Sequence, residues 1–125
     1  MNFDWSEYLN LAKELAGHAV SRAGQEARLR VAISRAYYAA FCKCRNHLRD
    51  KEVHHVPSGS RAHQYVRDQF KRSPNKLRKR IGYNLERLRS DRNKADYDDR
   101  VVLIDKLTNT DLALADKVIS ILNKL

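Results

Sequence analysis

The chain has 125 residues, the usual length of one domain, so we expect a single unit spanning residues 1–125. A content of 42% hydrophobic residues with only four glycines and two prolines excludes a disordered chain and favours packed helices. Twenty-five Lys and Arg against 15 Asp and Glu give a formal charge of +10, which favours an anionic partner: nucleic acid first, then an acidic protein or a membrane surface.

The N-terminal stretch MNFDWSEYLN lacks the basic and apolar segments of a signal peptide, and no apolar run is long enough to span a membrane. Cys42 and Cys44 stand two positions apart on a predicted helix, where side chains point in nearly opposite directions. They are therefore poorly placed for a mutual disulfide or a shared metal. These features predict a soluble, cytoplasmic protein with two free thiols and no membrane partner.

Two helices are predicted in the first half of the chain. A helix start of the capping-box type at Asp4 opens the first, which is expected to run to about Arg22 and to break at Gly24. The second is expected from Gln25 to about Asp50, without an internal proline or glycine. Its apolar face is wide enough for contacts on two sides, so this long helix should be central.

A loop and two more helices follow. The loop Lys51–Ser60 contains the helix-breaking residues that separate the second helix from a short third one at Arg61–Lys71. Ser73 is the predicted N-cap of a fourth helix, with Pro74 at its first position. This helix is expected to end between Lys94 and Asp98.

The last segment contains a short apolar run, Val101–Ile104, that has no partner strand elsewhere in the chain. We expect it to be an extended connector packed on the helices. One of the residues 108–110 should cap a final helix. The residues of this helix expected to face inward are Leu112, Ala115, Ile119 and Leu122. Together these elements predict an all-α, four- to five-helix up-and-down bundle with one long central helix.

Positive charge is concentrated between Arg67 and Lys94, where eleven Lys and Arg face three acidic residues, a net charge of +8. This predicts a basic face on the third and fourth helices, able to follow a phosphate backbone without reading bases. The alternative is a solvated helix face, although such faces usually mix charges of both signs more evenly.

Common catalytic patterns are absent: there is no Gly-rich phosphate loop and no metal-binding spacing. His54, His55 and His63 are unsuited to a metal without a carboxylate or thiolate partner, so we predict no metal and no cofactor. RNA can be cut without a metal if a histidine moves protons and an arginine stabilises charge on the phosphate. Arg49 and His54 form one such pair, but the sequence does not specify their geometry.

Two motifs point to a known family: SRAYYAAF at Ser34–Phe41 and RSDRNKADY at Arg89–Tyr97. In their order and separation, they make the chain resemble the HEPN superfamily, in particular its small stand-alone prokaryotic members. The resemblance extends roughly from the first predicted helix to the last. It implies a helical bundle that pairs as a homodimer through its motif-bearing helices, and a role as a metal-independent ribonuclease in toxin–antitoxin or phage-defence systems. It also implies a nucleotidyltransferase-type partner protein.

In HEPN ribonucleases the catalytic motif is an arginine followed by a histidine, and both protomers contribute to one cleft. Arg92 matches this arginine and Asn93 matches the polar residue after it, whereas Tyr97, Asp98 and Asp99 occupy the positions of the histidine. A carboxyl group with a pKa of about 4 and a phenol with a pKa of about 10 are both poor proton-transfer groups at neutral pH. The candidate catalytic residues are Arg92, Asp96 and Tyr97, and the candidate RNA- or phosphate-binding residues are Arg35, Arg89, Asn93, Lys76 and Arg80.

Three interpretations of this cluster remain open. Arg92 and Asp96 would form a structural ion pair at i,i+4, with Arg35 meeting Asp96 or Asp98 across helices and holding the helix end. Alternatively, the cluster would bind phosphate without chemistry, or it would cleave RNA. For the whole chain, the alternative function is a non-catalytic helical module that partners a nucleotidyltransferase-type protein.

Overall fold

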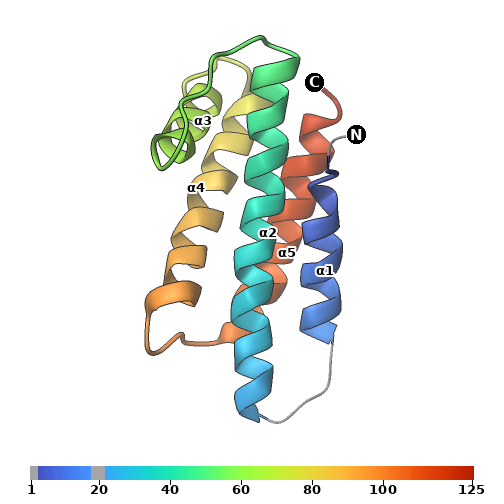
Figure 1. Ribbon diagram of the computed structural model, residues 1–125, viewed down its shortest axis with the longest axis vertical. Helices are drawn as coiled ribbons and strands as arrows, with labels where there is room; N and C mark the ends of the chain where they lie inside the picture. The colour runs from blue at the N-terminus through green and yellow to red at the C-terminus, as the bar shows by residue number, and fades with distance from the viewer. Residues whose placement is uncertain (1–2, 18–21) are drawn as a thin grey trace.

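The computed structural model describes residues 3–17 and 22–125, and within these ranges it contains five helices and no strand (Figure 1). The helices are α1 (Ser6–Gly17), α2 (Arg22–Asp50), α3 (Arg61–Lys71), α4 (Lys76–Tyr97) and α5 (Ile104–Leu122). The four longest lie side by side, with the short α3 beside one end of α4 (Figure 1). The predicted all-α bundle with one long central helix is therefore confirmed. None of the described helices has the length and apolar character needed to cross a bilayer.

The 29-residue helix α2 contacts all four other helices. It can do so because buried side chains occur on more than one of its sides, and several are small: Ala36, Ala39 and Ala40 are fully buried and allow the neighbouring helices to approach closely. Ile33 and Leu48 are also fully buried. Truncating either of these two side chains to alanine would cost about 2–5 kcal/mol, because it would leave a cavity in a packed interior.

The boundary between the first two helices differs from the prediction. Asp4 caps the start of α1 as expected, because its Oδ1 accepts a hydrogen bond of 3.0 Å from the Ser6 backbone N–H. However, α1 ends at Gly17, and Gly24 lies within the first turn of α2 instead of breaking the chain. A glycine costs a helix only about 1 kcal/mol relative to alanine, which a long, packed helix tolerates. The expected helical residues 18–21 lie outside the described residues.

The loop and α3 have the predicted bounds, but the start of α4 was wrongly assigned. Asn75, not Ser73, is the N-cap, and its side chain accepts a hydrogen bond of 3.0 Å from the Arg78 backbone N–H. Ser73 Oγ instead accepts from the Asn75 N–H at 3.2 Å, which shapes the turn that precedes the helix. Pro74 therefore lies before α4 and not at its first position. The end of α4 at Tyr97 falls within the predicted interval.

Helix α5 begins at Ile104, earlier than predicted. The hydroxyl of Thr108 donates to the Ile104 carbonyl at 2.7 Å from inside the helix, so Thr108 does not act as a cap. Val102 and Leu103 are 73% and 64% exposed, so the middle of the predicted connector is not packed on the helices, whereas Val101 and Ile104 are partly buried. The buried residues of α5 are Thr108, Asp111, Ala115, Val118, Ile121 and Leu122, while Leu112 and Ile119 are partly buried against the core.

Two carboxylic acids are buried together where α4 meets α5. Asp91 accepts a hydrogen bond of 2.8 Å from Arg87 Nε, which compensates its charge. Burial and the adjacent Asp91 carboxylate raise the pKa of Asp111 to about 9. Asp111 is therefore a neutral acid at pH 7.

Helix α3 is set against α4 at Gly82. A Cβ atom at this position would lie 2.5 Å from the backbone N of Lys71 and 2.9 Å from its Cα. Only glycine leaves room for a backbone approach this close. Gly82 therefore fixes the spacing between α3 and α4.

Candidate functional site

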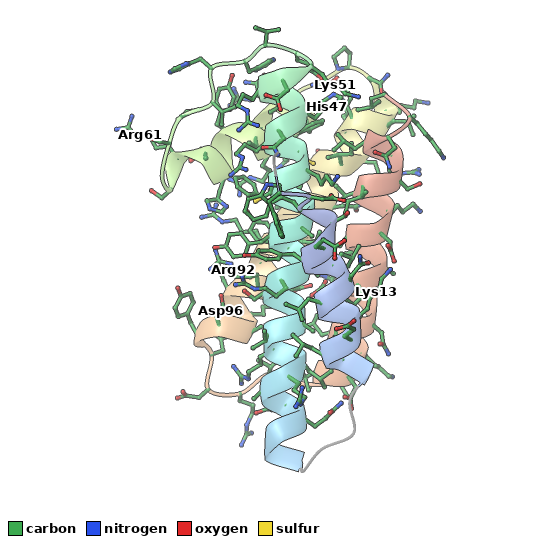
Figure 2. The ribbon with its side chains drawn as sticks, turned by 45° about the vertical axis from the view of Figure 1, so that its right-hand side comes forward. Lys13, His47, Lys51, Arg61, Arg92 and Asp96 are labelled. Atoms are coloured by element: carbon green, nitrogen blue, oxygen red, sulfur yellow. The ribbon has the colours of Figure 1, made fainter. Side chains whose placement is uncertain are left out.

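Arg92 lies at the interface between α4 and α2, with its side chain only 11% exposed (Figure 2). Its guanidinium carbon is 5.6 Å from the ring centre of Tyr37 and 5.2 Å from that of Tyr38, which is cation–π geometry. One guanidinium N–H donates to Asp96 Oδ2 at 3.3 Å. The predicted i,i+4 pair between Arg92 and Asp96 is thus present. The stretches SRAYYAAF and RSDRNKADY meet at these contacts.

A histidine that the sequence motifs did not single out lies beside these residues. The Tyr37 hydroxyl and His63 Nδ1 share a hydrogen bond of 2.5 Å, and the His63 ring stacks on Phe41 with the ring centres 4.3 Å apart. His63 lies on α3, one helical turn before Arg67. This i,i+4 spacing was the one signal in the sequence that could have placed both residues on a common face.

The protonation states of this pair follow from burial and nearby charge. Burial lowers the pKa of His63 to about 4, and the positive charges of Arg89, Arg92 and Arg67 act in the same direction. Burial also raises the pKa of the Tyr37 hydroxyl, which therefore remains protonated. At pH 7 both groups are neutral, so the Tyr37 hydroxyl can donate its proton to His63 Nδ1.

Arg67, Arg89 and Arg92, which we call the arginine cluster, surround His63 from α3 and α4. Arg67 and Arg89 line a groove of about 360 Å³ together with Asn93. The Nε atoms of Arg89 and Arg92 are buried and have no hydrogen-bond partner within the described part of the chain. Because both Nε atoms are enclosed by the protein, a ligand in the groove would meet the other guanidinium nitrogens of Arg89.

Arg35 does not meet Asp96 or Asp98, as one interpretation of the sequence required. Its guanidinium carbon lies over the rings of Tyr8 and Tyr38, at 5.0 Å and 5.3 Å from their centres. The helix end is held by Arg30 instead. Arg30 donates hydrogen bonds to the carbonyl oxygens of Ala95 at 2.9 Å, Asp98 at 2.7 Å and Asp99 at 3.2 Å.

The other predicted site residues do not all converge. Arg89 and Asn93 belong to the groove of the arginine cluster. Lys76 and Arg80 are exposed, and the helical spacing places them on the opposite side of α4 from Arg89. Tyr97 is 76% exposed and does not line the groove. The predicted basic face is therefore divided into an inner cluster and an outer stripe, because basic residues occur all round α4.

His54 and Arg49 have other contacts. His54 Nδ1 is hydrogen-bonded to the Tyr65 hydroxyl at 2.7 Å, and Arg49 forms hydrogen bonds of 2.8 Å and 3.0 Å with Asp50. The proposed Arg49–His54 pair therefore has each member engaged elsewhere. In the ranges that the structure describes, no three His, Cys, Asp or Glu side chains are grouped so as to hold a metal ion.

Comparison of the chain with the models of known protein families, with curated proteins and with solved structures yields no match. The likeness to the HEPN superfamily thus depends on the two motifs alone. The arginine cluster nevertheless suggests a type of ligand. Several guanidinium groups beside a neutral imidazole suit an anion with several acceptor oxygens, such as a phosphate diester.

Proposed function

We propose that this chain is an RNA-binding protein of the HEPN type, acting in a toxin–antitoxin or defence system, and that it binds the RNA backbone through the arginine cluster. The observation that carries the proposal is that Arg67 and Arg89, from two different helices, line one groove, with the guanidinium of Arg92 near by. A backbone phosphate in this groove would accept hydrogen bonds from the guanidinium groups of Arg67 and Arg89. Charge-assisted hydrogen bonds of this kind are the strong ones, and partial burial strengthens them further.

The charge of the whole chain supports the same proposal. A formal charge of +10 attracts RNA, and the exposed Lys76 and Arg80 on the outer side of α4 add to this field without lying in the groove. Binding of this type releases counterions from the nucleic acid, so its affinity falls steeply with salt.

The geometry favours binding over cleavage at neutral pH. His63 has a pKa of about 4 and its Nδ1 is engaged by Tyr37, so it is a weak base at pH 7. Asp96 is paired with Arg92, and Tyr97 does not line the groove. We therefore infer that the chain holds RNA without cutting it rapidly under these conditions.

The proposal includes a homodimer through α2 and α4. Val31 on α2 and Tyr97 on α4 are exposed, and their chain neighbours Arg30 and Asp98 are joined by a hydrogen bond of 2.7 Å. Two exposed side chains at this joint are suited to burial against a second copy. Such pairing would bring the ends of two SRAYYAAF-bearing helices together.

The test is RNA binding by matched arginine variants from one helix. A labelled single-stranded oligoribonucleotide is titrated at low and high salt with the wild type, Arg89→Ala and Arg80→Ala. We expect binding that weakens with salt, a loss of roughly tenfold or more for Arg89→Ala, and a small effect for Arg80→Ala. Equal affinity at both salt concentrations, or a larger loss for Arg80→Ala, would overturn the proposal.

A second candidate function is a helical interaction module for a nucleotidyltransferase-type protein. It is favoured by the exposed apolar pair Val102 and Leu103 in the connector between α4 and α5. Co-purification from the native host with the wild type and with Val102→Ser/Leu103→Ser decides between the two candidates. A complex that depends on these two residues, formed by a protein that does not bind RNA, would favour the module.

A further inference from the structure

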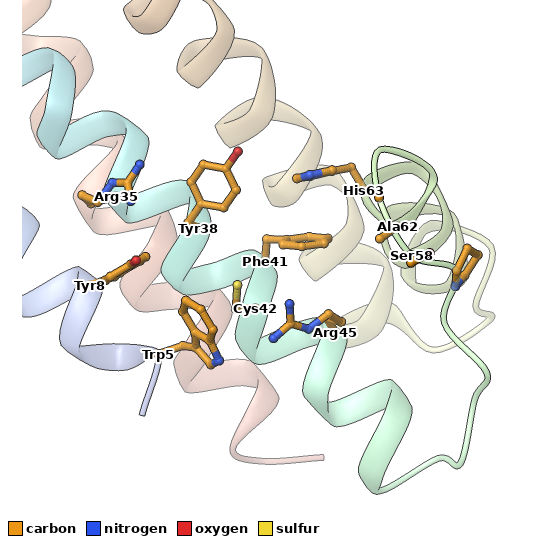
Figure 3. Close-up of a pocket in the computed structure, with 12 residues that line it drawn as sticks. Trp5, Tyr8, Arg35, Tyr38, Phe41, Cys42, Arg45, Ser58, Ala62 and His63 are labelled. Atoms are coloured by element: carbon orange, nitrogen blue, oxygen red, sulfur yellow. The ribbon is translucent and has the colours of Figure 1, made fainter. Parts of the chain in front are cut away.

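A pocket of about 660 Å³ lies beside the arginine cluster, between α1, α2 and the segment that leads into α3 (Figure 3). Aromatic side chains dominate it: Trp5 just before α1, Tyr8 on α1, and Tyr38 and Phe41 on α2. The volume lies within the range of pockets that take small organic ligands. A wall with this many rings offers flat faces against which a planar ligand can stack.

The pocket is positively charged as well as aromatic. Arg35 and Arg45 both line it, and none of its lining residues in the described part of the chain is acidic. The guanidinium carbon of Arg45 lies 5.4 Å from the ring centre of Trp5, and that of Arg35 lies 5.0 Å from the ring centre of Tyr8. Each arginine is thus placed beside a ring, so one ligand could contact both kinds of group.

We propose that this pocket binds one unpaired nucleotide, with its base against the aromatic side chains and its phosphate on Arg35 and Arg45. A purely apolar ligand would cover two guanidinium groups without supplying acceptors, which is unfavourable. An inorganic anion would leave the rings unused. A nucleotide satisfies both, since every base has a π-face and every nucleotide carries a phosphate.

The pocket adjoins the arginine cluster. Tyr38 lines the pocket and also lies under the guanidinium of Arg92, and His63 lines the pocket while facing the cluster. A strand whose phosphate lies in the groove of the arginine cluster would therefore bring a neighbouring nucleotide near the pocket. For RNA as the source of the nucleotide, the inference rests on the proposed function. The inference further requires single-stranded RNA. A paired base would have to leave its stack to enter the pocket, which costs free energy.

Trp5 makes the test direct, because it is the only tryptophan of the chain and it lines the pocket. The full chain is titrated with a single-stranded oligoribonucleotide, with the same backbone lacking its bases, with a duplex, and with a nucleoside monophosphate. Binding is followed by anisotropy of a label on each strand, and pocket occupancy by the emission of Trp5. We expect the base-containing single strand to quench this emission, and the abasic strand and the duplex to bind without quenching.

Matched variants separate the pocket from general charge. Arg45→Gln removes a guanidinium from the pocket, whereas Arg49→Gln removes one from an exposed position a turn further along α2 that is paired with Asp50. We expect Arg45→Gln to weaken single-strand affinity about tenfold and Arg49→Gln to have little effect. Thermal denaturation of both variants controls for folding.

The arms of the experiment give distinct outcomes. If RNA binds but Trp5 emission is unchanged, and if abasic and normal strands bind equally, the pocket proposal is overturned while the proposed function stands. If no strand binds but the monophosphate quenches Trp5 in an Arg45-dependent manner, the pocket takes free nucleotides and RNA binding fails. If neither strand nor monophosphate binds, both proposals are wrong.

Discussion

The hydroxyl of Tyr37 lies 2.5 Å from Nδ1 of His63, and this contact joins the central helix to the short helix α3. Tyr37 is buried and its pKa is raised by burial, while the same surroundings lower the pKa of His63 to about 4. Both side chains are thus neutral at pH 7, so the phenol can donate a hydrogen bond that the imidazole accepts. The contact orients an imidazole beside three guanidinium groups without adding a charge.

Removing the Tyr37 hydroxyl should destabilise the protein modestly. We expect Tyr37→Phe to lower the free energy of unfolding by about 1–2 kcal/mol, because one buried hydrogen bond is lost and His63 Nδ1 is left without its partner. Tyr97→Phe, at a side chain that is 76% exposed, is the matched control and should change little. Chemical denaturation measures both, and equal effects would contradict the importance of the contact.

His63 should titrate well below an ordinary histidine. Its pKa is about 4 in the folded protein and 6.5 in the unfolded chain, so the unfolded chain binds more protons between these values. Its contribution to stability is therefore complete above about pH 6.5 and is lost as the pH falls toward 4. We expect the difference in stability between wild type and His63→Gln to shrink over this window, with His55→Gln as the exposed control. NMR titration of the imidazole checks the pKa directly.

Asp111 should give the opposite dependence on pH. Its pKa is about 9 in the folded protein against 3.8 ordinarily, so the folded state binds the extra proton and stability falls as the pH rises from about 4 to about 9. Asp111→Asn cannot ionise and has nearly the same size and shape as the neutral acid. We expect it to match the wild type at low pH and to exceed it by at least about 1 kcal/mol near pH 8.

The control for this prediction lies on the same helix. Asp116 is exposed and forms an ion pair of 3.0 Å with Lys13. Asp116→Asn should lower stability by less than about 1 kcal/mol. A gain of Asp116→Asn over wild type that grows with pH, like that of Asp111→Asn, would refute the role of the buried pair.

Arg30 should control the order of the helix end that precedes the connector. It donates to three carbonyl groups, two of them at Ala95 and Asp98. We expect Arg30→Met to cost about 1–3 kcal/mol and to accelerate hydrogen exchange of the Asp98 amide, which donates to the Lys94 carbonyl at 2.9 Å. Arg28→Met, two residues earlier on α2, should leave this exchange rate unchanged.

RNA should survive contact with the protein at neutral pH. We expect purified wild type to bind RNA and to leave it intact, because no side chain in the groove is a strong proton acceptor at pH 7. Gel analysis of RNA after incubation with wild type and with Arg92→Ala measures this. Cleavage by the wild type that disappears in Arg92→Ala would show that the cluster catalyses and that binding alone is an incomplete description.

Periodicity was sufficient to predict most of the fold. The uninterrupted apolar spacing of α2 predicted a central helix, since a helix with buried side chains on several sides has few other stable positions. The predicted start of α5 was wrong because the Thr108 hydroxyl bonds to the Ile104 carbonyl from inside the helix. From the sequence alone, such a threonine cannot be distinguished from a helix cap. Similarly, Asn75 and Ser73 both carry capping oxygens, and only the backbone geometry decides between them.

The candidate site was predicted only in part, and the missing residues share one cause. Arg92 and Asp96 were found because their contact is local, one turn apart on a helix. His63 meets Tyr37 across 26 positions of the chain, and Arg30 meets Ala95 across 65. Such contacts depend on how the loop Lys51–Ser60 returns the chain, which no local pattern in the sequence specifies.

Gly82 controls how closely α3 and α4 approach each other, and therefore how closely the side chains of the site approach each other. The histidine and one arginine come from α3, and the other two arginines come from α4, so the gap between the two helices is also the gap between the chemical groups. A methyl group added at Gly82 would clash with the backbone of Lys71 and push α3 away from α4. The dimensions of the arginine cluster are thus determined by a residue that has no side chain and touches no ligand.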